Sequence, residues 1–209
     1  LAGLIPRFYD ATQGAVLVDG VDVRDYTFDA LYDRLGYVTQ KAVLFSGTVQ
    51  DNIFFGQSEA ADTDETLQQA LQLSQAAEFV DRYPEKAAHP IAQLGRNVSG
   101  GQKQRLSIAR ALARRPEILI FDDSFSALDY KADATLREGL AKQLPGTTKI
   151  IVAQRISTIR HADQILVLDR GEIAGLGTHD ALMASCPVYR EIAMSQLSEE
   201  ELKKGGASK

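Results

Sequence analysis

Residues 118–129 read ILIFDDSFSALD, an apolar run that ends in two adjacent aspartates and is followed by a serine-rich turn and a third aspartate. A continuous apolar run of this length is typical of a strand that is buried on both faces of a parallel sheet. Asp122 and Asp123 would then lie at the carboxyl end of the strand. Open α/β sheets bind their ligands at that edge.

Further apolar runs predict the rest of the sheet. They occur at 35–40, 148–154 and 164–169, and helical patterns separate most of them. Together they indicate an α/β fold with a mostly parallel sheet. A small antiparallel portion is predicted at VLVDGVDV (16–23), where Asp19 and Gly20 join two valine-rich runs as in a hairpin.

The helical pattern divides the chain into regions. Residues 41–115 lack strand signals and predict a helical subdomain, with one long helix at 64–83, inserted into a core formed by 1–40 and 116–195. Residues 196–209 are charged and predict a frayed helix end followed by a disordered tail. The first apolar residues, from Leu1 to Phe8, have helical spacing. We therefore expect the chain to open partway along a helix, with a further segment before it.

Composition excludes several classes of protein. The net charge of -5 argues against a nucleic-acid partner. The apolar runs are far shorter than the roughly 18 residues needed to cross a bilayer. The single cysteine, Cys186, excludes an intrachain disulfide and predicts a structural thiol.

Polar residues end three of the predicted strands: Gln40, the Asp122 and Asp123 pair, and Gln154. Each one alone is equally well explained as a strand-end polar residue or a helix cap. Their joint placement indicates one site. Asp122 is suited to hold Mg²⁺ in an ATPase, and the carboxylate of Asp123 could orient or deprotonate an attacking water.

A helix start at 97–102, NVSGGQ, is the second candidate site. Ser99 and Gln102 have capping-box spacing, and the two glycines leave the first backbone N–H groups uncovered. Such a helix start binds anions, although a plain capped helix explains the pattern equally well. Arginines further along this helix are predicted on its solvated side, and His161 and His179 on the surface. The arginines are at positions 105, 110, 114 and 115.

These residues match a known family. VSGGQ (98–102) resembles the signature motif of ABC ATPases, and ILIFDD (118–123) is similar to their Walker B strand. YVTQ, which ends at Gln40, resembles the Q-loop, and SALD (126–129) resembles the D-loop. IVAQRIS (151–157) resembles the switch-histidine segment. RFYDATQGAVLVDGVDVRDY (7–26) and VLFSGTVQDNIFFG (43–56) resemble the exporter branch, of multidrug or lipid type. The resemblance extends to about residue 195.

The resemblance implies a P-loop NTPase-like (RecA-like) domain at the cytoplasmic face of the cell membrane, which uses ATP and Mg²⁺ to drive export. Its partners would be a transmembrane domain and a second nucleotide-binding domain. Ser99, Gly100, Gly101 and Gln102 would contact the phosphate bound on that second domain. Asp129 would lie at the interface, and Gln40 would sense the metal.

Three departures from the family pattern matter. Residues 1–209 contain no GxxGxGK[ST] phosphate loop, so this chain by itself should not bind MgATP at submillimolar concentration. The catalytic glutamate of the family is Asp123 here, and a misplacement of about 1 Å can cost roughly 100-fold in rate. The switch histidine is Gln154, which cannot change charge near neutral pH. These losses predict the degenerate half of a heterodimeric exporter, whose intact signature completes the site of a catalytically complete partner.

Two other functions remain open. ATPases of chromosomes and DNA repair carry similar signatures, but they would need long heptads or a basic surface, and neither is present in the sequence. A non-catalytic regulatory module, in which nucleotide only joins two domains, is compatible with Asp123 and Gln154.

Overall fold

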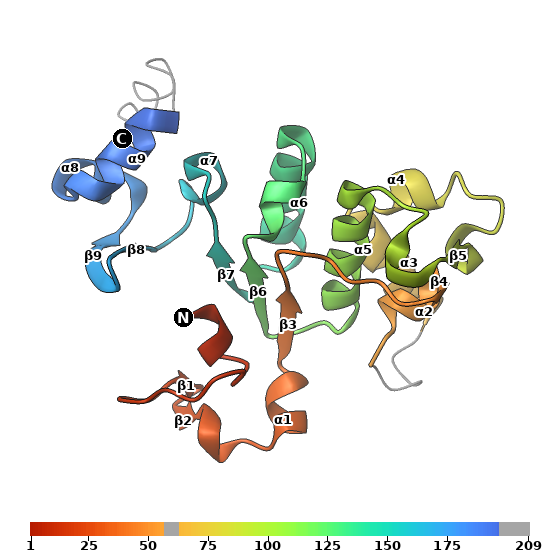
Figure 1. Cartoon of the computed structure of the whole chain (residues 1–209), viewed down its shortest axis with the longest axis horizontal. Helices are drawn as coiled ribbons and strands as arrows, with labels where there is room; N and C mark the ends of the chain where they lie inside the picture. Colours follow the sequence, from red (N-terminus) through yellow and green to blue (C-terminus); the bar gives the residue numbers. More distant parts are fainter. Residues whose placement is uncertain (57–62, 197–209) are drawn as a thin grey trace. The chain divides into compact units, whose positions relative to one another are not determined.

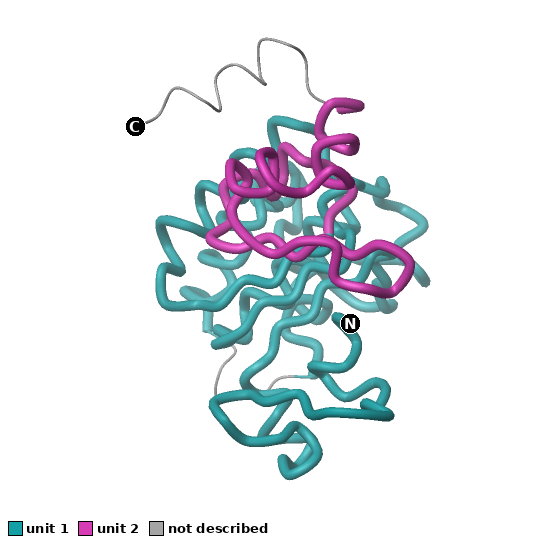
Figure 2. Tube along the Cα trace, turned by 90° about the vertical axis from the view of Figure 1, so that its left-hand side faces the viewer, with its two compact units in different colours: residues 1–152 teal, residues 153–209 magenta. Residues whose placement is uncertain are grey.

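The computed structural model describes residues 1–56 and 63–196. The chain forms two compact units, residues 1–152 and residues 153–209, which Figure 2 shows in different colours. The first unit contains two clusters of buried apolar side chains, and the second contains its own cluster around Leu182 and Tyr189.

A parallel sheet forms the centre of the first unit (Figure 1). Its strands lie in the order β3 (Leu35–Val38), β6 (Ile118–Asp122) and β7 (Thr148–Val152). Both pairings are parallel, so the prediction for these three apolar runs is confirmed. The middle strand is fully buried from Leu119 to Phe121 because it has a neighbour on each side and helices pack against it.

Helices surround this sheet in the first unit. They are α1 (Phe28–Tyr32), α2 (Val49–Ile53), α3 (Asp64–Leu73), α4 (Ala77–Val80), α5 (Gly100–Ala113) and α6 (Tyr130–Gln143). Short 3-10 turns are η1 (Ala2–Leu4), η2 (Val23–Asp25), η4 (Lys86–Ala88), η5 (Gln93–Gly95) and η6 (Ser124–Ala127). Helix α5 approaches strand β3 very closely at Gly36, where an added Cβ would lie 3.1 Å from the carbonyl oxygen of Ala111 and 2.8 Å from the Leu119 side chain.

The prediction of one long helix at 64–83 is wrong. The segment is divided into α3 and α4, because Gln75 has a left-handed backbone with φ of 60°. The Ser74 hydroxyl accepts a hydrogen bond from the Ala76 amide at 3.3 Å and supports the break. The proposed bounds of the helical subdomain, 41–115, stay a prediction.

The amino-terminal prediction is partly wrong. The first residues form only the 3-10 turn η1, since Pro6 cannot donate a backbone hydrogen bond and Arg7 has a φ of 58° that ends any helix. The hairpin prediction is confirmed. Strands β1 (Leu17–Val18) and β2 (Val21–Asp22) pair antiparallel, and both turn residues have positive φ, 49° at Asp19 and 80° at Gly20. A second short antiparallel pair joins β4 (Gly47–Thr48) to β5 (Pro90–Ile91).

The second unit contains α7 (Ile156–Ile159), β8 (Ile165–Asp169), β9 (Glu172–Gly177), α8 (His179–Ser185) and α9 (Pro187–Gln196). Strand β8 pairs antiparallel with β9, so the expectation of a parallel strand at 164–169 is corrected. Sequence reasoning missed β9. Arg170 and Gly171, at φ of 50° and 85°, form the turn between the two strands.

Two sequence expectations in the second unit have different outcomes. Cys186 is buried and its thiol lies 3.6 Å from the Ala174 carbonyl oxygen, which confirms a structural thiol. His179 is buried rather than on the surface, and its Nδ1 lies 2.8 Å from the Tyr189 hydroxyl. Burial lowers the pKa of this imidazole. The predicted tail at 197–209 lies outside the described residues.

None of the helices described within residues 1–56 and 63–196 is long and apolar enough to cross a membrane.

Candidate functional site

The carboxyl edge of the parallel sheet brings together the residues after β3 and β6. Val38 is aligned with Phe121 in the parallel register, so the chain leaves both strands at the same edge. Gln40 follows β3 by two residues, Asp122 is the last residue of β6, and Asp123 follows it. The sequence prediction that these side chains lie close together agrees with the geometry described below.

Asp122 is held by a tyrosine of the neighbouring strand. The Tyr37 hydroxyl donates a hydrogen bond to Oδ2 of Asp122 at 2.8 Å. Desolvation of the tyrosine, reinforced by this hydrogen bond, raises the pKa of Tyr37 to about 12. Tyr37 therefore stays protonated and keeps donating at neutral pH, which fixes the direction of the Asp122 carboxylate. Sequence reasoning missed this contact because 85 residues separate the two side chains.

Asp123 has a constrained backbone. Its φ of 48° is in the left-handed region, which aspartate tolerates better than most residues. Two backbone hydrogen bonds hold it there: its amide donates to the Val152 carbonyl at 3.0 Å, and its own carbonyl accepts from the Ser126 hydroxyl at 2.7 Å. The residue is 8% exposed. Its position is therefore set by the backbone of β7 and by the turn η6.

The side chains of Asp123 and Gln40 bond each other directly. Gln40 Nε2 donates to Asp123 Oδ2 at 2.7 Å. The helix α5 supports this arrangement from behind, since Gln104 Nε2 donates to the Thr39 carbonyl at 3.2 Å.

The oxygen atoms at this edge suit a magnesium ion. Oδ1 of Asp122 and the amide oxygen of Gln40 accept no hydrogen bond from the described residues. Carboxylate and amide oxygens are ligands that Mg²⁺ prefers. In the described ranges, no group of three His, Cys, Asp or Glu could hold a metal ion. A Mg²⁺ ion here would need further oxygens from phosphate and water, which is its usual coordination in ATPases.

The helix start at 99–102 forms the predicted capping box. Ser99 Oγ accepts from the Gln102 amide at 3.3 Å, and Gln102 Oε1 accepts from the Ser99 amide at 2.8 Å. An added Cβ would meet nothing within 4 Å at Gly100, and at Gly101 its nearest atom would be the Ala127 carbonyl oxygen at 3.6 Å. Neither glycine is thus required by packing within the described residues.

Asp129 caps the helix α6. Its carboxylate accepts a hydrogen bond from the Ala132 amide at 2.8 Å, and this bond is the largest cause of the lowered pKa of Asp129. Gln154 belongs to the second unit. Its carbonyl accepts a hydrogen bond from Gln196 Nε2 at 2.8 Å. The structure thus brings Gln40, Asp122 and Asp123 together within the first unit.

Comparison with known proteins identifies the family. The sequence profile of the ABC transporter family matches residues 1–126, which is more than half of the chain. The chain belongs to the ABC transporter family. The fold agrees: a bacterial Atm1-family ABC exporter, solved with ATP bound, superposes on 95% of this chain with a TM-score of 0.89 and 36% sequence identity.

Two relatives of this ABC chain carry informative names. An uncharacterised ABC transporter ATP-binding protein of Mycobacterium tuberculosis is 48% identical over 94% of the chain, and an ATP-dependent lipid A-core flippase of Syntrophus aciditrophicus is 40% identical over 97%. The chain spans about a third of the length of the proteins it matches: 34% and 33% of these two relatives and 35% of the exporter structure.

In this ABC domain Arg105, Arg110 and Arg114 are only partly exposed and are hydrogen-bonded to other segments, which corrects the sequence expectation for them, whereas Arg115 is exposed as expected. Arg105 donates to the Gln75 carbonyl at 3.3 Å and pairs with Glu78 at 2.9 Å. Arg110 is partly buried and donates to three oxygens of the segment after Gln40. A long side chain with five donors can satisfy carbonyl groups that no secondary structure satisfies, and an amphipathic pattern does not reveal this.

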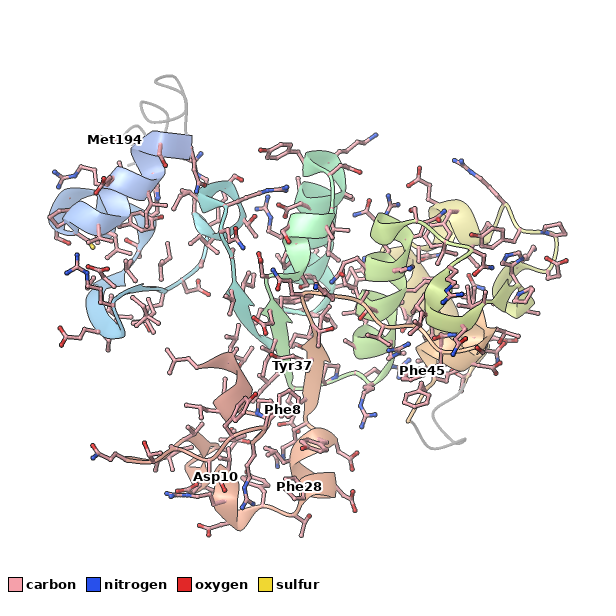
Figure 3. The ribbon with its side chains drawn as sticks, viewed as in Figure 1. Phe8, Asp10, Phe28, Tyr37, Phe45 and Met194 are labelled. Atoms are coloured by element: carbon pink, nitrogen blue, oxygen red, sulfur yellow. The ribbon has the colours of Figure 1, made fainter. Side chains whose placement is uncertain are left out.

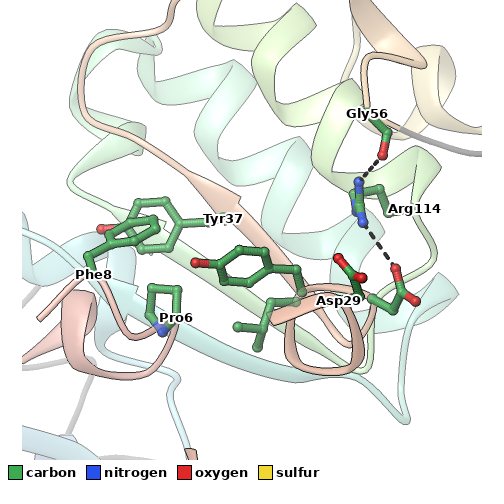
Figure 4. Close-up of a pocket in the computed structure, with 9 residues that line it drawn as sticks. Pro6, Phe8, Asp29, Tyr37, Gly56 and Arg114 are labelled. Atoms are coloured by element: carbon green, nitrogen blue, oxygen red, sulfur yellow. Dashed lines mark hydrogen bonds and ion pairs between the residues drawn. The ribbon is translucent and has the colours of Figure 1, made fainter. Parts of the chain in front are cut away.

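A cavity of about 390 Å³ lies beside the start of β3 in the first unit (Figure 4). Phe8 and Tyr37 lie together on one side of it and pack edge to face, with ring centroids 5.2 Å apart (Figure 3). Arg114 contributes to the opposite side, where it bonds the Gly56 carbonyl at 2.8 Å. The complete lining is Pro6, Phe8, Asp29, Tyr32, Asp33, Leu35, Tyr37, Gly56 and Arg114. The ring of Tyr37 therefore borders this cavity while its hydroxyl holds Asp122.

Proposed function

We propose that this chain is the ATP-binding part of an ABC exporter, lies at the cytoplasmic face of the cell membrane, and couples ATP binding and hydrolysis to export. The observation that carries the proposal is the cluster at the sheet edge, in which Asp122 is fixed by Tyr37 and Gln40 contacts Asp123. The relatives named as a flippase and as an exporter with ATP bound support the class of function.

The strand-edge residues divide the work at the nucleotide. Asp122 and Gln40 would hold Mg²⁺, and the bound ion would neutralise part of the charge of the phosphates. Asp123 lies next to them and would orient the attacking water or accept its proton. Because Tyr37 donates to one oxygen of Asp122, the carboxylate keeps its other oxygen directed for coordination without rearrangement.

The signature residues Ser99, Gly100, Gly101 and Gln102 would contact a phosphate bound on a second nucleotide-binding domain. Gly100 supports this role, because no neighbouring atom explains the lack of a side chain there. The start of a 14-residue helix also presents backbone N–H groups and a positive dipole end to an anion. Asp129 would lie at the same interface, and a transmembrane domain would complete the exporter.

The site of this chain is proposed to be the degenerate one of a heterodimer. Asp123 replaces a glutamate and Gln154 replaces a histidine, so the carboxylate lacks about 1 Å of reach, which can cost roughly 100-fold in rate. The hydrogen bond from Gln40 adds to this deficit, because it engages the shortened carboxylate at 2.7 Å. A catalytically complete partner domain would then hydrolyse ATP with the help of this chain's signature.

The decisive experiment measures MgATP hydrolysis by the protein that carries residues 1–209, alone and with its partner half. We expect slow turnover alone and fast turnover in the complex. The double variant Asp123→Glu with Gln154→His should raise the rate of the protein alone by about 100-fold. The matched control, Asp64→Glu with Gln72→His at two exposed positions of α3, should leave the rate unchanged.

Fast turnover by the unaltered protein alone would refute the degenerate site. So would a double variant that binds MgATP normally and hydrolyses it no faster. If the complex is also inactive, the protein is instead a non-catalytic regulatory module of the ABC type. The mutual bond between Gln40 and Asp123 favours this second candidate, since a carboxylate engaged by an amide is less available to water.

A further inference from the structure

Gln104 and Arg110 of the helix α5, and Arg114 directly after it, hold the segment that runs from the end of β3 through α2. Gln104 donates to the Thr39 carbonyl, Arg110 to the Val43 carbonyl at 3.0 Å, and Arg114 to the Gly56 carbonyl at 2.8 Å. These carbonyls span residues 39–56, which we call the clamped segment. The signature helix therefore holds this segment at its start, middle and end, beginning one residue before Gln40.

Arg110 makes the most contacts with the clamped segment. Besides the Val43 carbonyl, its guanidinium donates to the Asn52 carbonyl at 2.7 Å and to Asn52 Oδ1 at 3.0 Å. It also lies 5.4 Å and 5.8 Å from the ring centroids of Phe45 and Phe55, which stack on each other at 4.2 Å. Within the described part of the chain, Arg110 forms no ion pair.

A cation that is partly removed from water and has no anionic partner is costly unless oriented dipoles replace that water. Burial lowers the pKa of Arg110, yet a guanidinium remains charged. Each of its three nitrogens donates to a carbonyl or amide oxygen, and the guanidinium also lies near two aromatic rings. Those contacts have a fixed geometry, so Arg110 imposes one arrangement on the clamped segment.

Asn52 extends this arrangement through the segment. It is 1% exposed, and its Nδ2 donates to the carbonyls of Phe45 and Thr48 at 2.9 Å and 3.0 Å. Its Oδ1 accepts from the Phe45 amide at 2.8 Å as well as from Arg110. One side chain therefore connects Arg110 to both sides of the turn that carries the exposed ring of Phe45.

We propose that Arg110 is a positioning residue that makes the clamped segment and the signature helix α5 move as one body. Through it, a displacement of the exposed Phe45 and Phe55 pair is transmitted both to Gln40 and to Ser99. The proposal rests on the function proposed above, in which Gln40 and Ser99 serve two nucleotide sites. Arg110 itself contacts neither site.

The test compares Arg110→Met with Arg115→Met in the complete protein with its partner half. Both substitutions remove a guanidinium, but Arg115 is exposed and bonds only the Gln69 side chain among the described residues, at 3.3 Å. Hydrogen exchange of residues 39–56 should become at least about ten-fold faster in Arg110→Met. The ratio of the ATPase rate of the complex to that of the protein alone should fall at least about five-fold, with the KM for MgATP unchanged. Arg115→Met should change neither quantity.

The outcomes separate this inference from the proposed function. Unchanged exchange in residues 39–56 would refute the clamp. Faster exchange with an unchanged ratio of the two ATPase rates would show a structural role only and refute the positioning role. So would ATPase rates of the protein alone and of the complex that fall in proportion. If Arg110→Met fails to fold, Arg110→Lys decides, because lysine keeps the charge but cannot bond Val43 and Asn52 together. An inactive wild-type complex would refute the proposed function. Hydrogen exchange of residues 39–56 would then be the only test of whether Arg110 holds the clamped segment.

Discussion

Replacing Tyr37 with phenylalanine removes a single hydroxyl group from the edge of the candidate site. That hydroxyl donates to Asp122 at 2.8 Å, and desolvation together with this bond raises the pKa of Tyr37 to about 12. An unperturbed tyrosine has a pKa of about 10. The difference links the pH dependence of folding to this one contact.

The sign and size of the effect follow from the two pKa values. Because the folded pKa is the higher one, the stabilisation is complete below pH 10 and is lost as the pH rises through 12. At pH 11 about ten-elevenths of unfolded chains but about one-eleventh of folded chains would have ionised Tyr37, which corresponds to about 1.4 kcal/mol. Tyr37 is only partly buried, and solvent screening reduces this to about 1 kcal/mol.

The assay is urea unfolding of the wild-type protein and of Tyr37→Phe at pH 9 and at pH 11. The advantage of the wild type should shrink by about 1 kcal/mol between the two pH values. Tyrosinate absorbance, recorded within milliseconds of a pH jump, should show a wild-type minus variant difference with a midpoint near 12. Tyr9→Phe is the control, because that ring is 75% exposed. A stability difference that does not change with pH would refute the reasoning.

Three further predictions concern the same framework. Ser99→Ala should lower the free energy of unfolding by about 1 kcal/mol, because the Gln102 amide loses its cap. Ser99→Asn should keep most of this stability, because asparagine also caps helices. Equal urea midpoints for the two variants would contradict this prediction. Asn52→Ala should lower the free energy of unfolding by about 1–2 kcal/mol, because it leaves the carbonyls of Phe45 and Thr48 without this partner in a partly buried site. Thermal unfolding measures the loss, and Gln50→Ala at an exposed position of α2 is the control. Asp129→Asn should keep the cap of α6 but remove the pH dependence of its contribution to stability. Because the pKa of Asp129 is lowered in the folded state, the wild-type stabilisation is present above a pH of about 4 and is lost as the pH falls. An acid titration of the free energy of unfolding should show this loss in the wild type and not in the variant.

The sequence predicts those parts of the structure that short-range signals determine. The hairpin at Asp19 and Gly20, the apolar strands β3, β6 and β7, and the capping box at Ser99 each depend on residues a few positions apart. The meeting of Gln40 with Asp123 followed from one further rule, that the carboxyl ends of parallel strands share an edge.

Contacts between distant positions were not predictable in the same way. Tyr37 meets Asp122 across 85 residues, and Arg110 meets Asn52 across 58. The spacing of apolar residues places arginines on the opposite, solvated side of a helix, because a charged group is expected to be hydrated by water. In this fold, carbonyl groups of an irregular segment satisfy it instead. Likewise the left-handed Gln75, which divides the predicted helix at 64–83, has no signal in its residue type.

The pairing of Asp123 with Gln40 changes what the short carboxylate means for catalysis. A glutamate at position 123 would carry its carboxylate about 1 Å further, towards the place where water would be activated. Gln40 Nε2 lies 2.7 Å from Asp123 Oδ2, so a glutamate held at the same backbone position by Val152 and Ser126 would change this bond as well as its own reach. The proposed slow site is then a carboxylate that Gln40 engages, and not merely one that falls short.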